Sequence, residues 1–152
     1  MSIKPTSKEI VVQTASGLLI LLFLYTGSNK FFAFDHFVGQ MQNQVFPQTW
    51  VPFLIYGLPS IEIIIAVLLM FNKTKMIALW ASLVLMSLFT IYTALVLFNF
   101  FGRVPCSCGG VIEQLSWGQH LIFNLVFVFI AITGIFFWKE SNKSVARQAI
   151  LS

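Results

Sequence analysis

The sequence is poor in charged residues. Its 152 residues include nine Lys or Arg and five Asp or Glu, so 9% are charged and 58% are hydrophobic. Soluble domains carry about 25% charged residues, and this chain has too few to coat a globular surface. A soluble single-core domain is therefore excluded. Intrinsic disorder and nucleic-acid binding are excluded as well, because the chain is apolar, its net charge is only +4, and no basic cluster alternates with aromatic residues.

Long apolar tracts take the place of the missing charge. Four of them have the roughly 20 residues that a helix needs to cross a bilayer, and they cover residues 10–29, 52–71, 76–101 and 117–138. We expect an all-α integral membrane four-helix bundle, in contact with the lipid bilayer, formed by a single domain over residues 1–152. The first tract could instead be a cleaved signal peptide, but no small-x-small cleavage site follows it, so we expect it to remain as a span.

The basic residues are unevenly distributed between the ends of these tracts. Seven of the nine lie near the termini or in the turn at 72–75, whereas Lys30 and Arg103 lie in the two other loops. The positive-inside rule then places the N and C termini in the cytoplasm and the two longer loops outside. We expect a multi-pass protein of the cell inner membrane whose long loops face the oxidising periplasm.

The first outer loop contains an apolar stripe at helical spacing. The stripe and the polar positions opposite it are Phe34, Phe37, Val38, Met41 and Val45 against Gln40, Gln42, Asn43 and Gln44. This pattern predicts a short amphipathic helix at the membrane interface, with Asp35 as its N-cap. A simpler interpretation is that the phenylalanines serve only as interfacial anchors.

The second outer loop holds the two cysteines of the chain, Cys106 and Cys108, followed by Gly109 and Gly110. On an oxidising side of a membrane, such a pair indicates a disulfide or a metal clip. A Cys-x-Cys disulfide closes a very small ring and needs a bent backbone, which the two glycines would ease. Because strain makes a disulfide easier to reduce, the pair would be exchangeable rather than a structural staple.

Polar residues also follow this loop at the start of the fourth tract. Ser116 and Gln119 match a capping box and predict that the helix begins at Trp117. His120 then lies in the first turn and Asn124 one turn deeper on the same face, beneath the cysteine loop. A helix N-terminus favours a thiolate and a neutral imidazole, so His120 is a candidate base. The alternative is a histidine that only forms a hydrogen bond between helices.

Glu62 is the acidic residue within the apolar tracts. A charged residue at this depth costs about 2.5–3.5 kcal/mol on insertion scales, so we expect Glu62 to be paired, protonated or facing a polar cavity. Its depth depends on where the helix begins. A start at Pro52 places it about 15 Å along the helix, whereas a start at Pro59 places it in the first turn. Lys30 is a candidate partner.

Three segments together resemble a known family. They are residues 26–37, with Lys30 and Asp35, residues 58–62, with Glu62, and residues 106–110, with both cysteines. They are similar to the methylamine utilisation protein MauE family, within the wider DoxX-like group. The resemblance implies a four-helix membrane bundle tied to periplasmic thiol-disulfide chemistry. It also implies a role in methylamine metabolism, through maturation of the disulfide-rich small subunit of methylamine dehydrogenase.

Two hypotheses about function follow. In the first, Cys106 and Cys108 exchange disulfides with a thioredoxin-like partner or a disulfide-containing client, while Glu62 and His120 tune the pair or shuttle protons. Because the sequence has no second cysteine pair, a quinone or another protein must complete the electron circuit. The candidate cofactors are therefore a quinone or the redox-active disulfide itself.

In the second hypothesis the protein is a non-enzymatic binding or assembly subunit. Cys106, Cys108 and His120, with His36 as a further candidate, would hold a soft metal such as zinc or copper(I). Their spacing matches no established zinc pattern. The redox hypothesis is favoured, because an exchangeable pair facing outward is what disulfide exchange requires.

Overall fold

The computed structural model describes residues 6–102 and 116–151, with side chains to residue 142. These residues form helices and no strand, in the order α1 (Ser7–Phe32), α2 (Phe34–Gln42), α3 (Val51–Met70), α4 (Lys75–Leu97) and α5 (Trp117–Leu151). All except α2 are long and apolar enough to cross a membrane, and the candidate span in α5 is Trp117–Asn142. The predicted all-α architecture with four membrane-spanning helices is confirmed.

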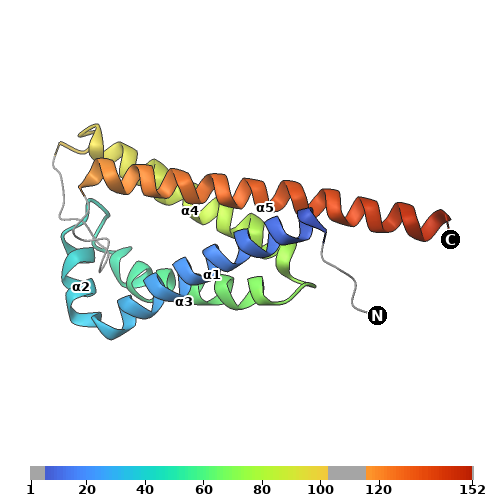
Figure 1. Cartoon of the computed structure of the whole chain (residues 1–152). Coiled ribbons are helices and arrows are strands. Elements are labelled where there is room, and N and C mark those ends of the chain that lie inside the picture. The colour runs from blue at the N-terminus through green and yellow to red at the C-terminus, as the bar shows by residue number, and fades with distance from the viewer. Residues whose placement is uncertain (1–5, 103–115, 152) are drawn as a thin grey trace.

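The four long helices run up and down beside one another. Helix α1 packs on α3 and α5, and α4 packs on the same two helices (Figure 1). The start of α1 and the end of α5 lie at one end of the bundle and α2 lies at the other (Figure 1). We call these the termini end and the α2 end. The main core between the helices contains Leu19, Phe23, Leu69, Leu79 and Ala131.

The helix ends follow local chemistry. Helix α5 begins at Trp117, as expected, because the Ser116 backbone N–H donates to Gln119 Oε1 at 2.9 Å and the Gln119 N–H donates to Ser116 Oγ at 3.3 Å. Helix α4 ends at Leu97, four residues before the expected end at 101. Asn99 follows with φ 53°, a left-handed conformation that asparagine tolerates and that stops a helix.

Helix α3 resolves the two starting points that the sequence left open. It begins at Val51, with Pro52 in its first turn, and Pro59 lies inside the helix. Glu62 is therefore about 16 Å from the start of the helix, and the interpretation in which Pro59 begins it is wrong. Pro59 lacks an N–H, so one backbone hydrogen bond is missing near Glu62. Ser60 Oγ donates to the Tyr56 carbonyl at 2.7 Å in the same stretch.

The predicted helix in the first outer loop is present as α2, but its surroundings differ from those expected. Its apolar residues Phe37 and Met41 pack with Val51 and Ile55 of α3 in a small second core. The apolar stripe of α2 therefore packs against α3, although it was expected to contact the membrane surface. Its position at a membrane interface stays a prediction.

Two further expectations for this segment are wrong. Asp35 does not cap α2, because the helix begins at Phe34 behind Ala33 and has no side-chain cap; Asp35 is exposed in the first turn. Gln40 and Gln44, expected on the polar outer face, are buried. The pattern placed these glutamines opposite the stripe, but the neighbouring helices enclose that side as well.

The termini end carries three of the basic side chains on which the predicted orientation depends, Lys8, Lys75 and Lys139. Lys8 Nζ lies 2.6 Å from Glu140, joining α1 to α5. Lys75 and Lys139 lie over the rings of Trp138 and Trp80, at 5.6 and 5.4 Å from the ring centroids. This arrangement is compatible with a cytoplasmic termini end, which stays a prediction.

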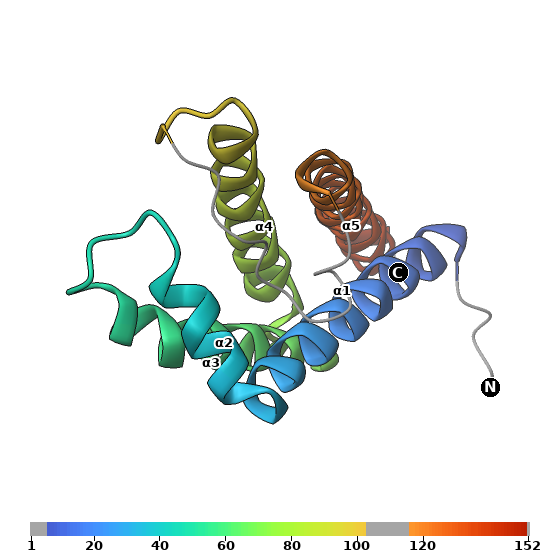
Figure 2. The same ribbon diagram turned by 90° about the vertical axis from the view of Figure 1, so that its left-hand side faces the viewer.

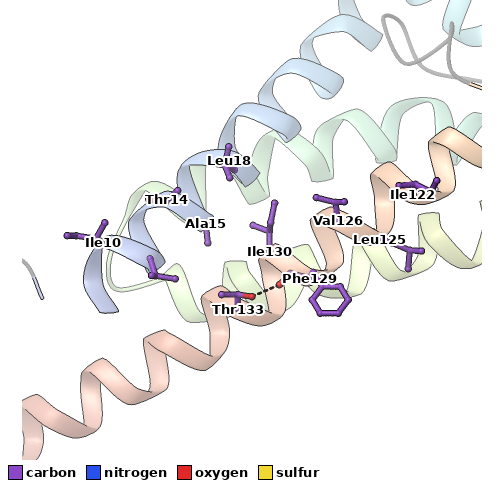
Figure 3. Close-up of a pocket in the computed structure, with 11 residues that line it drawn as sticks. Ile10, Thr14, Ala15, Leu18, Ile122, Leu125, Val126, Phe129, Ile130 and Thr133 are labelled. Atoms are coloured by element: carbon purple, nitrogen blue, oxygen red, sulfur yellow. Dashed lines mark hydrogen bonds between the residues drawn. The ribbon is translucent and has the colours of Figure 1, made fainter. Parts of the chain in front are cut away.

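Helices α1 and α5 leave an apolar groove on the outside of the bundle. Figure 3 shows its side chains, with Ile10 and Leu18 from α1 and Ile122, Val126 and Phe129 from α5. The Thr133 hydroxyl is turned back to its own helix and donates to the Phe129 carbonyl at 2.8 Å (Figure 3). In a membrane, lipid chains would contact this apolar surface of the helix pair. We call it the α1/α5 groove.

Candidate functional site

A cavity of about 520 Å³ lies within the α2 end of the bundle, and all five helices contribute to its wall. Figure 2 views the molecule from this end, where α4 and α5 stand apart from α1, α2 and α3. The wall is mostly apolar, but it also includes Lys30, Glu62, His120 and Asn124. With His36, which also lines the cavity, the structure brings together five of the candidate site residues singled out from the sequence.

Lys30 and Glu62 form an ion pair inside this cavity. Lys30 Nζ lies 2.5 and 2.7 Å from the two carboxylate oxygens of Glu62. The Glu62 side chain is only 1% exposed, and the Thr26 hydroxyl is hydrogen-bonded to its carboxylate. A buried carboxylate needs such partners, because leaving it unpaired would cost several kcal/mol. The predicted pairing of Glu62 with Lys30 is confirmed.

Gly27 allows the two helices that carry this pair to approach closely. A Cβ added to Gly27 would lie 2.9 Å from Ile63 Cδ1 and 3.3 Å from Glu62 Cβ. Any larger residue would therefore require the Ile63 side chain to move or α1 to shift away from α3 beside the ion pair. Sequence reasoning did not assign this role to Gly27, although it lies three residues before Lys30, which is one helical turn.

Aromatic rings surround the lysine ammonium. The rings of Phe37 in α2 and Phe89 in α4 have their centroids 5.9 and 6.0 Å from Lys30 Nζ. Cation–π contact of this kind stabilises an ammonium group that has left water. The side chains of Lys30 and Glu62 are 15% and 1% exposed, so the ion pair is largely removed from water and its electrostatic attraction is stronger than at the surface.

His120 and Asn124 lie on the other side of the cavity, on the same face of α5 as predicted. Asn124 is buried and its Nδ2 donates to Thr93 Oγ1 of α4 at 3.3 Å. The His120 ring stacks on Trp117, with centroids 6.4 Å apart. Its Nδ1 is buried and has no hydrogen-bond partner within the described part of the chain. The catalytic roles assigned to these residues stay predictions.

Sequence reasoning missed several polar groups of this cavity. Tyr92 donates its hydroxyl to Gln44 Oε1 at 2.5 Å, and its ring stacks on Phe46 with centroids 5.0 Å apart. Thr93 holds Asn124. The available signal was the run of Thr90, Tyr92 and Thr93 in a helix that otherwise contains few polar residues.

One family match covers most of the chain. The model of the methylamine utilisation protein MauE family matches residues 8–137. The protein belongs to the MauE family. With its four candidate spans, it is a multi-pass membrane protein. No curated protein and no solved structure matches the chain.

The cysteine loop of this MauE-family chain is not part of the described structure. Cys106, Cys108, Gly109 and Gly110 lie outside the described residues. The described residues next to the loop are informative, since Phe101 before it and Trp117 after it both line the cavity. The chain thus leaves the described structure and returns to it beside the cavity.

The metal hypothesis requires ligands from the same loop. His36 and His120 both line the cavity, but the described residues contain no group of three or more His, Cys, Asp or Glu that could hold a metal ion. Since both cysteines lie outside those residues, the proposed set of Cys106, Cys108 and His120 stays untested. The described polar groups of the cavity can form hydrogen bonds with a ligand.

Proposed function

We propose that this MauE-family protein supports thiol-disulfide chemistry outside the cell inner membrane, through Cys106 and Cys108 in its periplasm-facing second outer loop. Its partner is a thioredoxin-like protein or a disulfide-containing client whose maturation depends on the exchange. The family match makes methylamine metabolism the first context to test.

The observation that carries the proposal is the group of buried polar residues in the cavity beside the ends of the cysteine loop. Phe101 and Trp117 line the cavity, and Cys106 lies four residues beyond Gly102. Four residues span at most about 14 Å, so Cys106 cannot be farther than this from the end of the described chain. Buried polar groups in a membrane-spanning bundle mark functional positions, because lipid makes them costly.

The exchange is balanced in electrons and protons. A thiolate attacks one sulfur of a disulfide, breaks the S–S bond and forms a mixed disulfide, which the second thiolate of the attacking pair then resolves. The net result is that one pair gains the two electrons and two protons that the other loses. We propose that His120 accepts or supplies a proton in this exchange, and that Lys30 keeps Glu62 in place beside the cavity.

The test is the redox state of the cysteines in native membranes. Alkylation with a mass-tagged maleimide, before and after mild reduction, should shift the wild-type chain by two tags only after reduction. Cys106→Ser should lose this reversible shift and trap a mixed disulfide through Cys108. Ser107→Ala is the matched control, because it alters the same loop without removing a thiol, and it should behave like the wild type.

Two outcomes would contradict the proposal. Cysteines that are fully alkylated before reduction in every growth condition would show that no disulfide forms. Cysteines protected from alkylation until a chelator is added would instead support the metal-binding alternative with Cys106, Cys108 and His120.

A further inference from the structure

We infer that the cavity at the α2 end binds a lipid-soluble quinone, which enters from the hydrocarbon between α3 and α4. The inference rests on the proposed function in one respect, namely that disulfide exchange needs an electron carrier to complete its circuit. The binding site itself consists only of residues that the structure describes.

The cavity reaches the lipid-facing side of the bundle. Leu88 and Ile91 of α4 line it and are nevertheless 58% and 56% exposed. Leu88 lies nine residues before the end of α4, or about 14 Å along the helix. At this depth a membrane-spanning helix contacts the hydrocarbon chains and not the lipid headgroups. Of the four neighbouring pairs of long helices, α3 and α4 are packed least extensively. A lipid-soluble molecule therefore has a route into the cavity from the side.

The polar groups inside the cavity suit carbonyl oxygens. An ammonium group has three N–H donors, and the interactions of Lys30 with Glu62 occupy two of them. On the other side are the buried Nδ1 of His120, which lacks a partner within the described residues, and the amide of Asn124. A quinone ring carries two carbonyl oxygens on opposite sides. One would accept a hydrogen bond from the third N–H of Lys30, and the other from the remaining N–H of the Asn124 amide or from His120 in its Nδ1–H tautomer.

The charge of the cavity favours a neutral ligand. Lys30 and Glu62 are the Lys, Arg, Asp or Glu residues among its described lining, and their formal charges cancel. A phospholipid phosphate or a fatty-acid carboxylate would be buried here without a counter-charge, at a cost of several kcal/mol. A quinone ring carries no charge, and the phenyl rings of Phe37 and Phe89 beside Lys30 provide surfaces for it to stack on.

The volume is adequate for such a head group. A cavity of about 520 Å³ falls within the range of roughly 300–1,000 Å³ that small-molecule sites occupy. An isoprenoid or alkyl tail would lie along Leu88 and Ile91 and continue into the bilayer. Oxidation of two thiols to a disulfide releases two electrons and two protons, and a quinone takes up both to become a quinol with two new O–H bonds. The reverse exchange balances in the same way.

The inference is tested by photolabelling the full chain in phosphatidylcholine nanodiscs with an azidoquinone, with and without excess decylubiquinone as competitor. We expect labelled peptides from residues 23–37 and 85–95, with labelling removed by the competitor. Leu88→Trp fills the opening and should lower the competed labelling at least tenfold. Val84→Trp is the matched control, because it lies one turn away on the same helix, is also exposed and does not line the cavity.

Other results would overturn the inference. Labelling that the competitor does not reduce, or that maps to the α1/α5 groove, would show general partition into lipid. Equal labelling of Leu88→Trp and Val84→Trp would also indicate general partition into lipid. If Leu88→Trp does not fold, Ile91→Trp tests the same opening. A phospholipid that copurifies in the cavity and resists displacement by decylubiquinone would identify a different ligand.

The experiment separates this inference from the proposed function. The double variant Cys106→Ser/Cys108→Ser cannot exchange disulfides, but it should keep competed labelling, since the inferred contacts come from the helices. If the wild-type chain shows competed labelling but no reversible alkylation shift, the proposed function alone is contradicted. A reversible alkylation shift with no competed labelling would contradict the quinone site alone.

Discussion

Two hollows in the described part of the bundle are similar in size and different in character. The α1/α5 groove encloses about 550 Å³ and the cavity at the α2 end about 520 Å³. The groove has two threonines as its polar residues, and Thr133 bonds to its own helix (Figure 3). The cavity instead contains a buried ion pair and groups from five helices. Volume alone therefore does not identify a site, whereas converging polar groups do.

The largest effect should come from breaking the ion pair of the cavity. Lys30→Met leaves the Glu62 carboxylate buried without its partner, and we expect a loss of about 3–5 kcal/mol in stability. Thermal unfolding in detergent should show a much lower midpoint. The double variant Lys30→Met/Glu62→Leu should recover most of the loss, because two apolar residues need no partner.

The matched control is the ion pair at the termini end. Lys8 and Glu140 are both exposed, so Lys8→Met should cost less than about 1 kcal/mol. If Lys30→Met were no more destabilising than Lys8→Met, burial of the Lys30–Glu62 pair would not make it more important for stability than the exposed pair.

A smaller effect is expected from closing the gap between α1 and α3. Gly27→Ala places a methyl group 2.9 Å from Ile63 Cδ1, and overpacking of this kind costs about 1–3 kcal/mol. Ile63→Val removes the Cδ1 atom and should restore much of the stability when combined with Gly27→Ala. The unfolding midpoint of each variant measures the effect.

Gly17 offers a control on the same helix. Nothing lies within 4 Å of a Cβ added to Gly17, so Gly17→Ala should be neutral or stabilise the helix by up to about 1 kcal/mol. Equal destabilisation by the two substitutions would rule out a close approach of α1 and α3 at Gly27.

The smallest effects are expected from removing one threonine hydroxyl from each hollow. Thr93→Val in the cavity removes the acceptor of the Asn124 amide and should cost about 1–2 kcal/mol, since Asn124 remains buried. Thr133→Val in the groove removes a bond that Thr133 makes only with its own helix, and we expect a change below about 0.5 kcal/mol. A larger loss for Thr133→Val than for Thr93→Val would reverse the contrast between the two hollows.

Some of the site could be predicted because the chemistry of a bilayer leaves few choices. A lone acid in an apolar tract needs a partner, which made Lys30 a candidate for Glu62 before its position was known. The capping box of Ser116 and Gln119 is a local signal, so it placed the start of α5 correctly. His120 and Asn124 then share a face because of helical periodicity alone.

Other features depended on contacts that no local pattern contains. Pro52 and Pro59 both fit the start of a helix. The part of α3 that precedes Pro59 packs against α2 through Val51 and Ile55, which favours the earlier start. Gln40 and Gln44 looked like a solvated face, but they are enclosed by neighbouring helices. The polarity of a residue does not reveal whether it faces water or the interior of a bundle.

The sequence by itself determined that this protein crosses a membrane with four helices, because apolar tracts of this length have no stable place in water. It also determined which residues would be costly in lipid and therefore need partners. Only the tertiary structure decided that those residues share one cavity, since the positions of Lys30, Glu62 and His120 relative to one another depend on how three separate helices pack. Close packing at Gly27 brings two of these helices together, and this contact is a property of the folded bundle.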